Sequence, residues 1–283
     1  MTVYEVMNKC IRQLRQAGIK SPQADVEWLT SDVLKCHRSE LALQSHKMPT
    51  REQIYRIQKN IKRRMDREPL QHILGMCDFY GYEFRVSSAA LIPRPETESL
   101  AELALGFLQP LSSPVTFELG TGSGCISITL AKRCPGIKLI ASDVSKSALT
   151  LAKLNAETLD VIDQMDFREA DGLAALPNYE QVNLIISNPP YIPSEDIADL
   201  QPEVRDFDPH LALDGGGDGL RFHRLLAAEG QSHLKPGGKL MAEFGDGQES
   251  TIEDLFNQAT WPSVKIINDL AGCPRIVIAS AAQ

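Results

Sequence analysis

The sequence predicts an α/β protein in two parts: a small helical bundle, then a seven-stranded, mostly parallel sheet whose last strand is antiparallel. Three observations lead to this prediction. Up to about residue 70, apolar residues recur only at helical spacing. From about residue 114, short β-branched runs alternate with helical segments, the pattern of a parallel sheet covered on both faces. No helical segment separates the last two runs, so their strands should be antiparallel neighbours.

Length and composition restrict the class of protein. The 283 residues are 43% hydrophobic, and no apolar run approaches the roughly 18 residues that a membrane span needs. The N-terminus lacks the basic flank and apolar core of a secretory signal, so we expect a cytoplasmic protein with no membrane partner. The six cysteines lie far apart and form no Cys-x2-Cys pair, so neither a metal site nor a disulfide framework is expected.

The net charge of −8 is unevenly distributed along the chain. Residues 1–70 carry 14 Lys and Arg against 8 Asp and Glu, a balance of +6, whereas residues 71–283 carry 15 against 29, a balance of −14. An acidic larger part argues against stable, non-specific nucleic-acid binding by that part. The basic part is either a docking surface for an acidic partner or RNA, or a solvated helical surface.

Residues 1–70 predict a helical bundle. Apolar residues at helical spacing cover 3–14, 24–34 and 54–61. The second series follows Ser21-Pro22, a cap with a first-turn proline, and Thr50 should cap the third. The basic run from Lys59 to Arg67 should line one wet helix face. Because few residues here carry chemistry, we expect docking rather than catalysis.

Residues 71–98 are expected to link the two parts. The aromatic and β-branched run 79–86, with Gly81 in its middle, predicts a β-hairpin. In the next segment Pro93 and Pro95 stiffen the chain, and a helix should begin at Glu96 or Thr97. We expect this segment to form a wall of a ligand cleft at the domain junction.

Residues 99–283 predict the sheet-containing domain. Strands are expected near 115–119, 138–142, 165–168, 183–187, 239–243, 264–268 and 275–279. Helices are expected at 124–133, 146–157, 217–233 and 249–258, and the last two strands are joined by residues 269–274. This alternation places the strand ends, and the loops that follow them, at one edge of the sheet.

The chain is organised around Asn188-Pro189-Pro190-Tyr191, which follows an apolar run over 182–187 that predicts a buried parallel strand. These four residues therefore stand at the strand's carboxyl end, where open α/β sheets bind ligands. The prolines fix φ and remove two N–H donors, which leaves a rigid rim of oxygen acceptors with an aromatic face beside it. Such a rim suits a planar –NH2 group, although Asn-Pro also marks ordinary turns.

A glycine loop and two acidic residues predict a cofactor site. Gly120-Thr121-Gly122-Ser123-Gly124 lies between a strand that contains Glu118 and a helix, so its backbone can approach a ligand closely. Asp143 ends the next strand and is placed to accept both ribose hydroxyls of an adenosine, or else to cap a helix. Asp171-Gly172 follows the third strand and should flank the adenine.

The two candidate cofactors are a nicotinamide dinucleotide and S-adenosylmethionine. Hydride transfer gains nothing from a rigid rim that binds an amine, whereas methyl transfer to an –NH2 nitrogen does. The residues 188–191 therefore favour S-adenosylmethionine.

At this point the chain resembles the Asn-Pro-Pro-Tyr class of S-adenosylmethionine-dependent amino methyltransferases, whose sheet is Rossmann-like. Over nearly its whole length it is similar to the HemK-type peptide chain release factor glutamine methyltransferases. The blocks that carry this resemblance lie at 69–75, 91–98, 117–126, 188–193, 214–220, 234–238 and 269–275. The most specific of them is Arg94-Pro95-Glu96-Thr97-Glu98, because the glycine loop is common to many methyltransferases.

The resemblance implies a helical substrate-docking domain (1–70), a hairpin linker (71–98) and a methyltransferase domain (99–283) that acts on release factors. We expect a monomer, because nothing in the sequence demands a higher oligomer. The resemblance also implies site residues. Catalysis would fall to Asn188, Pro189 and Tyr191, and substrate binding to Asn188, Pro189, Pro190 and Tyr191. The cofactor would contact Glu118, Gly120, Thr121, Gly122, Ser123, Gly124, Asp143, Asp171, Gly172 and Asn188.

Two residues depart from the family pattern: Glu118 stands where Asp is frequent, and Gly172 where a larger residue is frequent. Three alternatives stay open. In the first, the enzyme methylates a glutamine of a ribosomal protein; in the second, it methylates the exocyclic amine of an adenine in nucleic acid. In the third, the chain is a binding module without catalysis.

Overall fold

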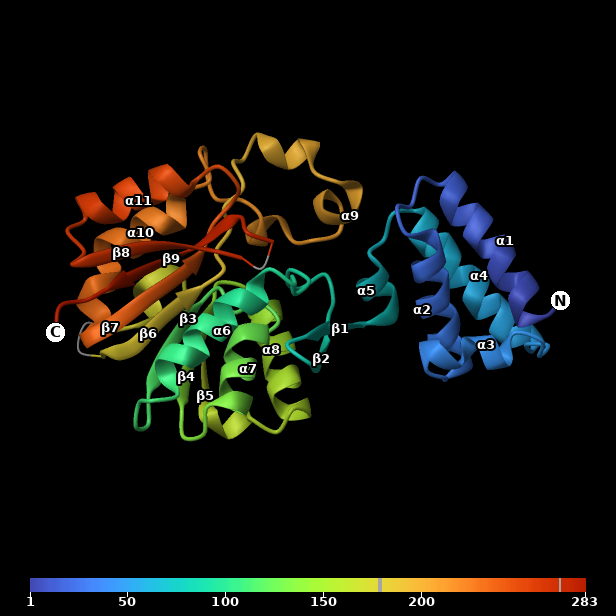
Figure 1. Ribbon diagram of the computed structural model, residues 1–283, viewed down its shortest axis with the longest axis horizontal. Coiled ribbons are helices and arrows are strands. Elements are labelled where there is room, and N and C mark those ends of the chain that lie inside the picture. The colour runs from blue at the N-terminus through green and yellow to red at the C-terminus, as the bar shows by residue number, and fades with distance from the viewer. Residues whose placement is uncertain (178–179, 270) are drawn as a thin grey trace. The chain divides into compact units, whose positions relative to one another are not determined.

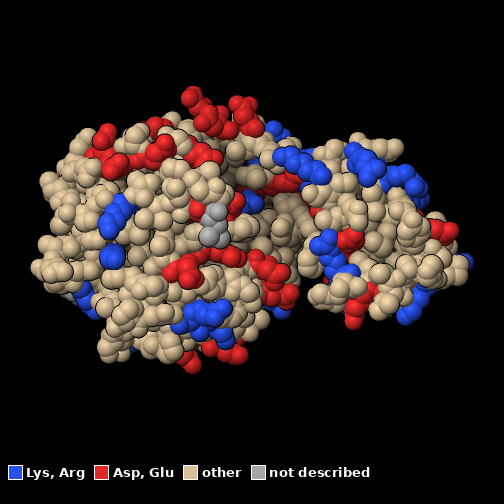
Figure 2. Space-filling view, in the orientation of Figure 1, with Lys and Arg blue, Asp and Glu red and all other residues tan. Residues whose placement is uncertain are grey.

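A computed structural model of the chain describes residues 1–177, 180–269 and 271–283 (Figure 1). It divides into two compact units, Met1–Met76 with Gln201–Phe207, and Cys77–Leu200 with Asp208–Gln283. The first unit is helical and the second contains the large sheet. On the face shown in Figure 2, Lys and Arg gather on the helical unit, and Asp and Glu predominate on the sheet-containing unit. Leu270, within the predicted connection 269–274, lies outside the described residues.

The helical unit is built from amphipathic helices. It contains α1 (Val3–Gln16), α2 (Pro22–Leu34), α3 (Leu41–Gln44), α4 (Arg51–Met65), α5 (Leu70–Leu74) and α9 (Pro202–Arg205). Residues one helical turn apart, such as Val6, Cys10 and Leu14 of α1, share a buried core with Ile57 and Ile61 of α4. The three long helices predicted from periodicity are thereby confirmed.

The two predicted helix caps have different outcomes. The Thr50 hydroxyl accepts a hydrogen bond from the Gln53 backbone N–H, and the Gln53 side chain accepts from the Thr50 backbone N–H, which forms a capping box. For Ser21 the outcome is mixed: it occupies the N-cap position and Pro22 begins α2 as predicted, but the Ser21 side chain makes no capping hydrogen bond.

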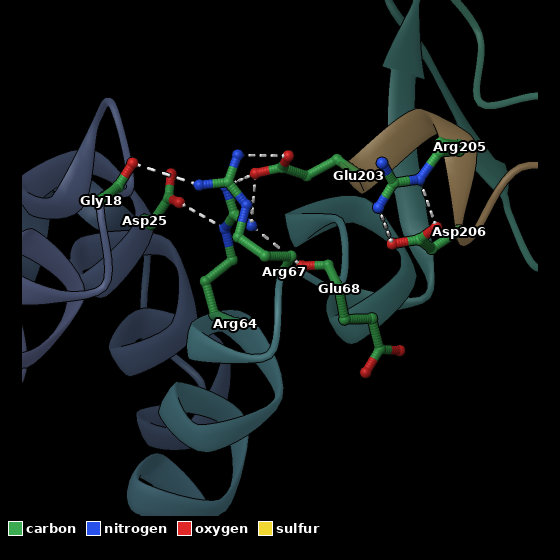
Figure 3. A network of polar contacts seen from close by, with 8 residues as sticks. All are labelled: Gly18, Asp25, Arg64, Arg67, Glu68, Glu203, Arg205 and Asp206. Atoms are coloured by element: carbon green, nitrogen blue, oxygen red, sulfur yellow. Dashed lines mark hydrogen bonds and ion pairs between the residues drawn. The ribbon is translucent and has the colours of Figure 1, made fainter. Parts of the chain in front are cut away.

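Arg64 is a buried cation within the helical unit, not part of the wet face expected for Lys59 to Arg67. Its Nε donates to Asp25 Oδ2 at 2.7 Å, and its Nη1 and Nη2 donate to Glu203 Oε1 at 3.1 Å each (Figure 3). Arg67 Nη2 donates to the other Glu203 oxygen at 2.6 Å. Two arginines of the basic run therefore attach α9, which carries Glu203, to the helices of this unit.

Among the described residues, seven strands form the large sheet, in the order β5-β4-β3-β6-β7-β9-β8. They are β3 (Val115–Leu119), β4 (Lys138–Asp143), β5 (Met165–Glu169), β6 (Val182–Ser187), β7 (Leu234–Glu243), β8 (Ser263–Asn268) and β9 (Pro274–Ser280). The first five pair in parallel, and β9 pairs antiparallel with both β7 and β8. The sheet predicted from the sequence is confirmed.

Helices cover both faces of this sheet. They are α6 (Thr97–Leu108), α7 (Cys125–Arg133), α8 (Lys146–Thr158), α10 (Arg221–Glu229) and α11 (Glu249–Gln258) (Figure 1). Neighbouring residues of β6 face opposite cores: Leu184 and Ile186 pack with α6 and α7, whereas Ile185 packs with α10 and α11. Val182 packs on the same side as Ile185, because the pairing with β7 shifts register between Val182 and Leu184. Because both faces are buried, four of the six residues of β6 are apolar.

Three predicted boundaries were inexact. The helix expected over 217–233 is α10 from Arg221 to Glu229, followed by a 3-10 turn, Gly230–His233. The strand expected from 239 begins at Leu234. The hairpin consists of β1 (Met76–Phe79) and β2 (Tyr82–Arg85), and its turn has positive φ at Tyr80 and Gly81.

No helix among the described residues has the length and apolar character that a membrane crossing requires.

Candidate active site

A cavity opens in the sheet-containing unit at the carboxyl ends of β3, β4 and β6. It holds about 780 Å³ of unfilled space, including open solvent at its mouth. From β3 the chain builds the sheet first toward one edge, through β4 and β5, and then toward the other edge, beginning with β6. The loops after β3 and β6 therefore diverge, and a crevice is left between them. Its lining includes these residues expected from the sequence: Gly120, Gly122, Asp143, Asp171, Gly172, Asn188 and Pro190.

The glycine loop exposes its backbone to this cavity. Gly120 and Gly122 have φ values of +71° and +56°, in the left-handed region that favours glycine. A Cβ on Gly120 would meet no atom within 4 Å, so the space beside the backbone is open. Gly124 has a different role, because its Cβ would lie 2.8 Å from Ile128 Cδ1 and 3.2 Å from Ala152 Cβ. It permits the loop to pack closely on α7 and α8.

Glu118 stabilises the glycine loop through hydrogen bonds, and it is not among the residues that line the cavity. Its side chain is buried, and Oε2 accepts from Thr121 Oγ1 at 2.6 Å, from the Ser127 N–H at 3.3 Å and from the Ser127 hydroxyl. Burial raises its pKa to about 7, while the bonds from Ser127 and Thr121 oppose this shift. Thr121, Ser123 and Gly124 are likewise absent from the lining.

Asp143 joins the loop to the cavity. Oδ2 accepts from the Gly122 N–H and Oδ1 from the Ser145 N–H, each at 2.9 Å. The alternative role as helix cap falls to Ser145, whose hydroxyl accepts from the Ala148 N–H at the start of α8. A carboxylate has about four acceptor sites, more than these bonds use. Because burial raises its pKa, this carboxylate has lost part of its hydration and would gain from hydroxyl donors.

Gly172 lines the cavity with a φ of +59°, and a Cβ there would lie 2.6 Å from Leu225 Cδ2. The space that a larger residue would need is therefore already filled by Leu225. Beside it, Asp171 is exposed and 3.4 Å from Arg221 Nη2, and Phe222 contributes an aromatic ring to the lining. The open backbone of the glycine loop, the half-buried carboxylate of Asp143 and the ring of Phe222 together fit a ligand that contains a nucleoside.

Asn188 lies beside this cavity with one side of its amide already engaged. Its Nδ2 donates to Thr97 Oγ1 at 2.9 Å, and that hydroxyl donates to Glu243 Oε2 at 2.8 Å. Within the described residues, no hydrogen bond reaches Asn188 Oδ1. Thr97 begins α6 as predicted, but its hydroxyl serves this chain of hydrogen bonds and caps no helix.

Tyr191 is fixed by close backbone packing. A Cβ on Gly219 would lie 2.2 Å from the Tyr191 carbonyl oxygen, and one on Gly245 would lie 3.0 Å from the Tyr191 ring. Gln248 accepts from the Gly245 N–H through Oε1 and donates through Nε2 to the Tyr191 carbonyl at 3.0 Å. Burial raises the pKa of the Tyr191 hydroxyl, so it stays protonated. Pro189 is buried, and Pro190 lines the cavity.

An ion pair with a buried carboxylate holds a further segment of the cavity wall. Arg94 Nη2 donates to Asp208 Oδ2 at 2.7 Å, and the Asp208 side chain is 1% exposed. Burial raises the pKa of Asp208 to about 6, although Arg94 acts in the opposite direction. The next residues, among them Pro209 and Leu211, line the cavity, as does Leu91 from the segment predicted to form a wall.

The sequence-based reasoning missed Glu243, Gln248, Gly219, Gly245, Leu211 and Phe222. Gly219 belongs to a block that the resemblance had singled out, and its glycine was the available signal. Nothing in the sequence marks Leu211 or Phe222, because their position depends on how the chain after β6 returns over the cavity.

Across residues 1–177, 180–269 and 271–283, no group of three or more His, Cys, Asp and Glu side chains is placed to hold a metal ion.

Comparisons with known proteins match both units. Residues 5–75 match the model of the PrmC N-terminal domain, and residues 100–201 match that of the methyltransferase small domain. The release factor glutamine methyltransferase of Koribacter versatilis is 37% identical over 278 residues, which cover 98% of each chain. That of Bradyrhizobium diazoefficiens is 40% identical over 271 residues, covering 94% of this chain and 91% of its own.

A solved structure has the same fold. The methyltransferase from Pyrococcus furiosus superimposes with a TM-score of 0.55 and 20% identity, covering 72% of this chain and 91% of its own. At that identity the likeness concerns the arrangement of sheet and helices alone.

Proposed function

We propose that this chain, which belongs to the family of release factor glutamine methyltransferases, transfers a methyl group from S-adenosylmethionine to the side-chain amide nitrogen of a glutamine in a class I peptide chain release factor. The observation that carries the proposal is the placement of Asn188. Its amide borders the cavity, and its Nδ2 is already bound, so Oδ1 is left to accept from a substrate.

The cavity is the proposed site of the cofactor. Gly120 and Gly122 would hold it through their backbone, Asp143 would accept the two ribose hydroxyls, and Asp171, Gly172 and Phe222 would surround the adenine. The open space at Gly120 and the partly dehydrated carboxylate of Asp143 support this assignment. When bound there, S-adenosylmethionine would supply a methyl group on a positively charged sulfur.

The rim would hold the substrate amide. Asn188 Oδ1 and the Pro189 carbonyl are the proposed acceptors for the two N–H bonds of the glutamine carboxamide, and Tyr191 would pack against the amide plane. An amide nitrogen is a weak nucleophile because its lone pair is delocalised into the carbonyl. Two oxygens fixed at its N–H groups favour the positive charge that develops on nitrogen, and they hold the nitrogen in one direction.

No general base is needed in this scheme. Once the nitrogen carries four substituents it is strongly acidic, so its proton passes to solvent after the methyl group has been transferred. The residues Asn188, Pro189 and Tyr191 therefore position the substrate and stabilise charge, and none of them has to change its protonation state.

Finer properties also belong to the proposal. We infer a cytoplasmic monomer that recognises release factors without a stable nucleic-acid complex. The acidic balance of residues 71–283 supports the last point, because a negative surface repels phosphates.

The test is transfer of labelled methyl to three purified substrates: a class I release factor, a ribosomal-protein fraction and adenine-containing DNA. Each is tested with wild type, with Asn188→Ala and with a matched control, Asn257→Ala, an exposed asparagine on α11. Label on a release-factor glutamine should fall in Asn188→Ala by roughly 100- to 1,000-fold, or about 2.7–4 kcal/mol in the barrier. The control should behave as wild type.

Other outcomes would contradict the proposal. Label on DNA would replace glutamine by adenine as the substrate, and label on ribosomal protein would change the protein target. Cofactor binding without transfer to any substrate would favour a binding module. Near-normal turnover in Asn188→Ala would remove the role given to its amide.

A further inference from the structure

We propose that Glu243 is a positioning residue, which acts through the hydroxyl of Thr97 to orient the Asn188 carboxamide with Oδ1 toward the substrate. This inference deepens the proposed glutamine methylation and rests on it. The three side chains come from three elements that meet at the carboxyl edge of the sheet: Glu243 ends β7, Thr97 begins α6, and Asn188 follows β6.

The number of available hydrogens determines the orientation. A hydroxyl carries one hydrogen, and a carboxylate can only accept. With Glu243 ionised, Thr97 Oγ1 must donate to Glu243 Oε2, 2.8 Å away, and then has only lone pairs to offer Asn188. At 2.9 Å from Thr97 Oγ1, Asn188 must therefore present its NH2 group, and Oδ1 faces the other way.

Protonation of Glu243 would remove this constraint. A carboxylic acid can donate to Thr97, which frees the threonine hydrogen for Asn188 Oδ1. The flipped amide then makes an equally good hydrogen bond, and the rim presents NH2 to a substrate that itself offers N–H groups. The ionised carboxylate is thus the form that keeps the acceptor of the rim in place.

The surroundings of Glu243 bring its titration into the neutral range. Glu243 is 1% exposed, and burial raises the pKa of its carboxyl group to about 7. Hydrogen bonds from Thr97 and Tyr191 and the charge of Arg275 favour the ionised form, whereas Glu96 opposes it. A further titratable side chain near Glu243 is His223 of α10: its Nε2 is 2.9 Å from the Glu243 backbone carbonyl, and burial lowers its pKa to about 4. His223 is therefore neutral at pH 7.

A purely structural role for Glu243 is the competing explanation, and a spectroscopic test separates the two. The side-chain NH2 signals of Asn188 are observed in the full chain labelled with ¹⁵N-asparagine, and are identified by their loss in Asn188→Ala. In wild type they should shift with pH with a midpoint near 7. In Glu243→Gln, which keeps the shape but cannot ionise, they should not shift.

The matched control is Glu118→Gln. Glu118 is also buried with a pKa raised to about 7, but its partners are Thr121 and Ser127. This variant should leave the Asn188 titration intact. Signals of Asn188 that do not titrate in wild type, or that titrate equally in Glu243→Gln, would overturn the proposal. Because no substrate is present, this result does not depend on whether the release factor is methylated.

Kinetics complete the test at saturating cofactor. Thr97→Val removes the hydroxyl and should lower kcat at least tenfold with an unchanged Kd for S-adenosylmethionine, whereas Thr97→Ser should stay within threefold of wild type. Adding Glu243→Gln to Thr97→Val should cause no further loss, because the carboxylate acts through the hydroxyl. Wild-type kcat in Thr97→Val would contradict the proposal. Absent methylation in wild type, with the Asn188 titration present, would refute the proposed function alone.

Discussion

Gly219 offers a direct test of how Tyr191 is positioned. Its φ is +76°, and a Cβ would lie 2.2 Å from the Tyr191 carbonyl oxygen and 2.8 Å from Gln248 Nε2. The nearest atom belongs to the backbone, so it cannot rotate away as the end of a side chain can. Gly219→Ala must therefore displace Tyr191 or the loop that carries Gly219.

The required displacement follows from the contact distance. Ordinary carbon contacts begin near 3.4 Å, so relief of a 2.2 Å contact needs a shift of about 1.2 Å. A misplacement of about 1 Å at a positioning group lowers the rate roughly 100-fold, which corresponds to about 2.7 kcal/mol in the barrier. Because only Pro190 separates Tyr191 from the acceptors at 188 and 189, we expect a loss of this size in kcat/KM.

The assay compares Gly219→Ala with Gly136→Ala in methyl transfer to the release factor. Gly136 has a φ of +80° in an exposed turn, and its Cβ would meet nothing within 4 Å. Both variants carry the backbone strain of an alanine at positive φ, about 1–2 kcal/mol, but only Gly219→Ala carries the clash. A kcat/KM for Gly219→Ala within threefold of that for Gly136→Ala, both measured well below their Tm, would refute the reasoning.

Three further predictions concern the cavity wall, the helical unit and pH. Gly172→Ala must push Leu225 aside from 2.6 Å, so its affinity for S-adenosylmethionine by titration calorimetry should fall severalfold relative to Gly136→Ala. Glu203→Ala leaves Arg64 with Asp25 as its remaining carboxylate, so we expect the helical unit to lose about 1.5–3 kcal/mol of unfolding free energy. Denaturation followed by the fluorescence of Trp28, in a Trp261→Phe background, would measure this, and superimposable curves would contradict it. The raised pKa of Asp208 means that the folded state binds more protons between the ordinary value of 3.8 and about 6. The unfolding free energy of wild type should therefore fall as pH rises through that window, by at most about 1.4 kcal/mol per pH unit, and Asp208→Asn should flatten the slope.

The arrangement of the large sheet could be predicted from the sequence because its cause is local. The inner strands are short, mostly apolar runs that need two covered faces, and each helix has one apolar stripe, so the alternation along the chain leaves few topologies. Boundaries were less predictable where glycine and proline interrupt the pattern. The strand β7 begins at Leu234, five residues before the predicted start, because pairing with β6 continues past the Pro236-Gly237-Gly238 interruption through a register shift.

The helical unit shows the limit of periodicity more sharply. The series in α2 includes Trp28, which has the spacing of a core residue but is 39% exposed, with the Arg38 guanidinium 5.5 Å from its ring centroid. Arg64 shows the reverse, because a cation in a basic run is buried by carboxylates from α2 and α9. The partner on α9 stands 139 residues away in the sequence, and no local rule could have paired them.

The site divides in the same way. Gly120, Gly122, Asp143 and Asn188 could be predicted to line the cavity, because each lies at or just after the end of a strand and therefore near the ligand edge of the sheet. The residues that complete it come from later segments whose positions are set by tertiary packing, such as Phe222 and Gly219. Their roles became visible only as distances.

Glu243 lies between these two cases. A glutamate at the end of a buried, apolar strand loses its hydration, and this loss must be offset by hydrogen bonds from neighbouring groups. At the carboxyl edge of a parallel sheet those neighbours are the ligand-bearing loops, so a lone carboxylate in such a strand is itself a signal of a supported site. Glu118 in β3 and Glu243 in β7 both have this pattern, and each braces the residue that borders the cavity: Glu118 the glycine loop, and Glu243, through Thr97, the amide of Asn188.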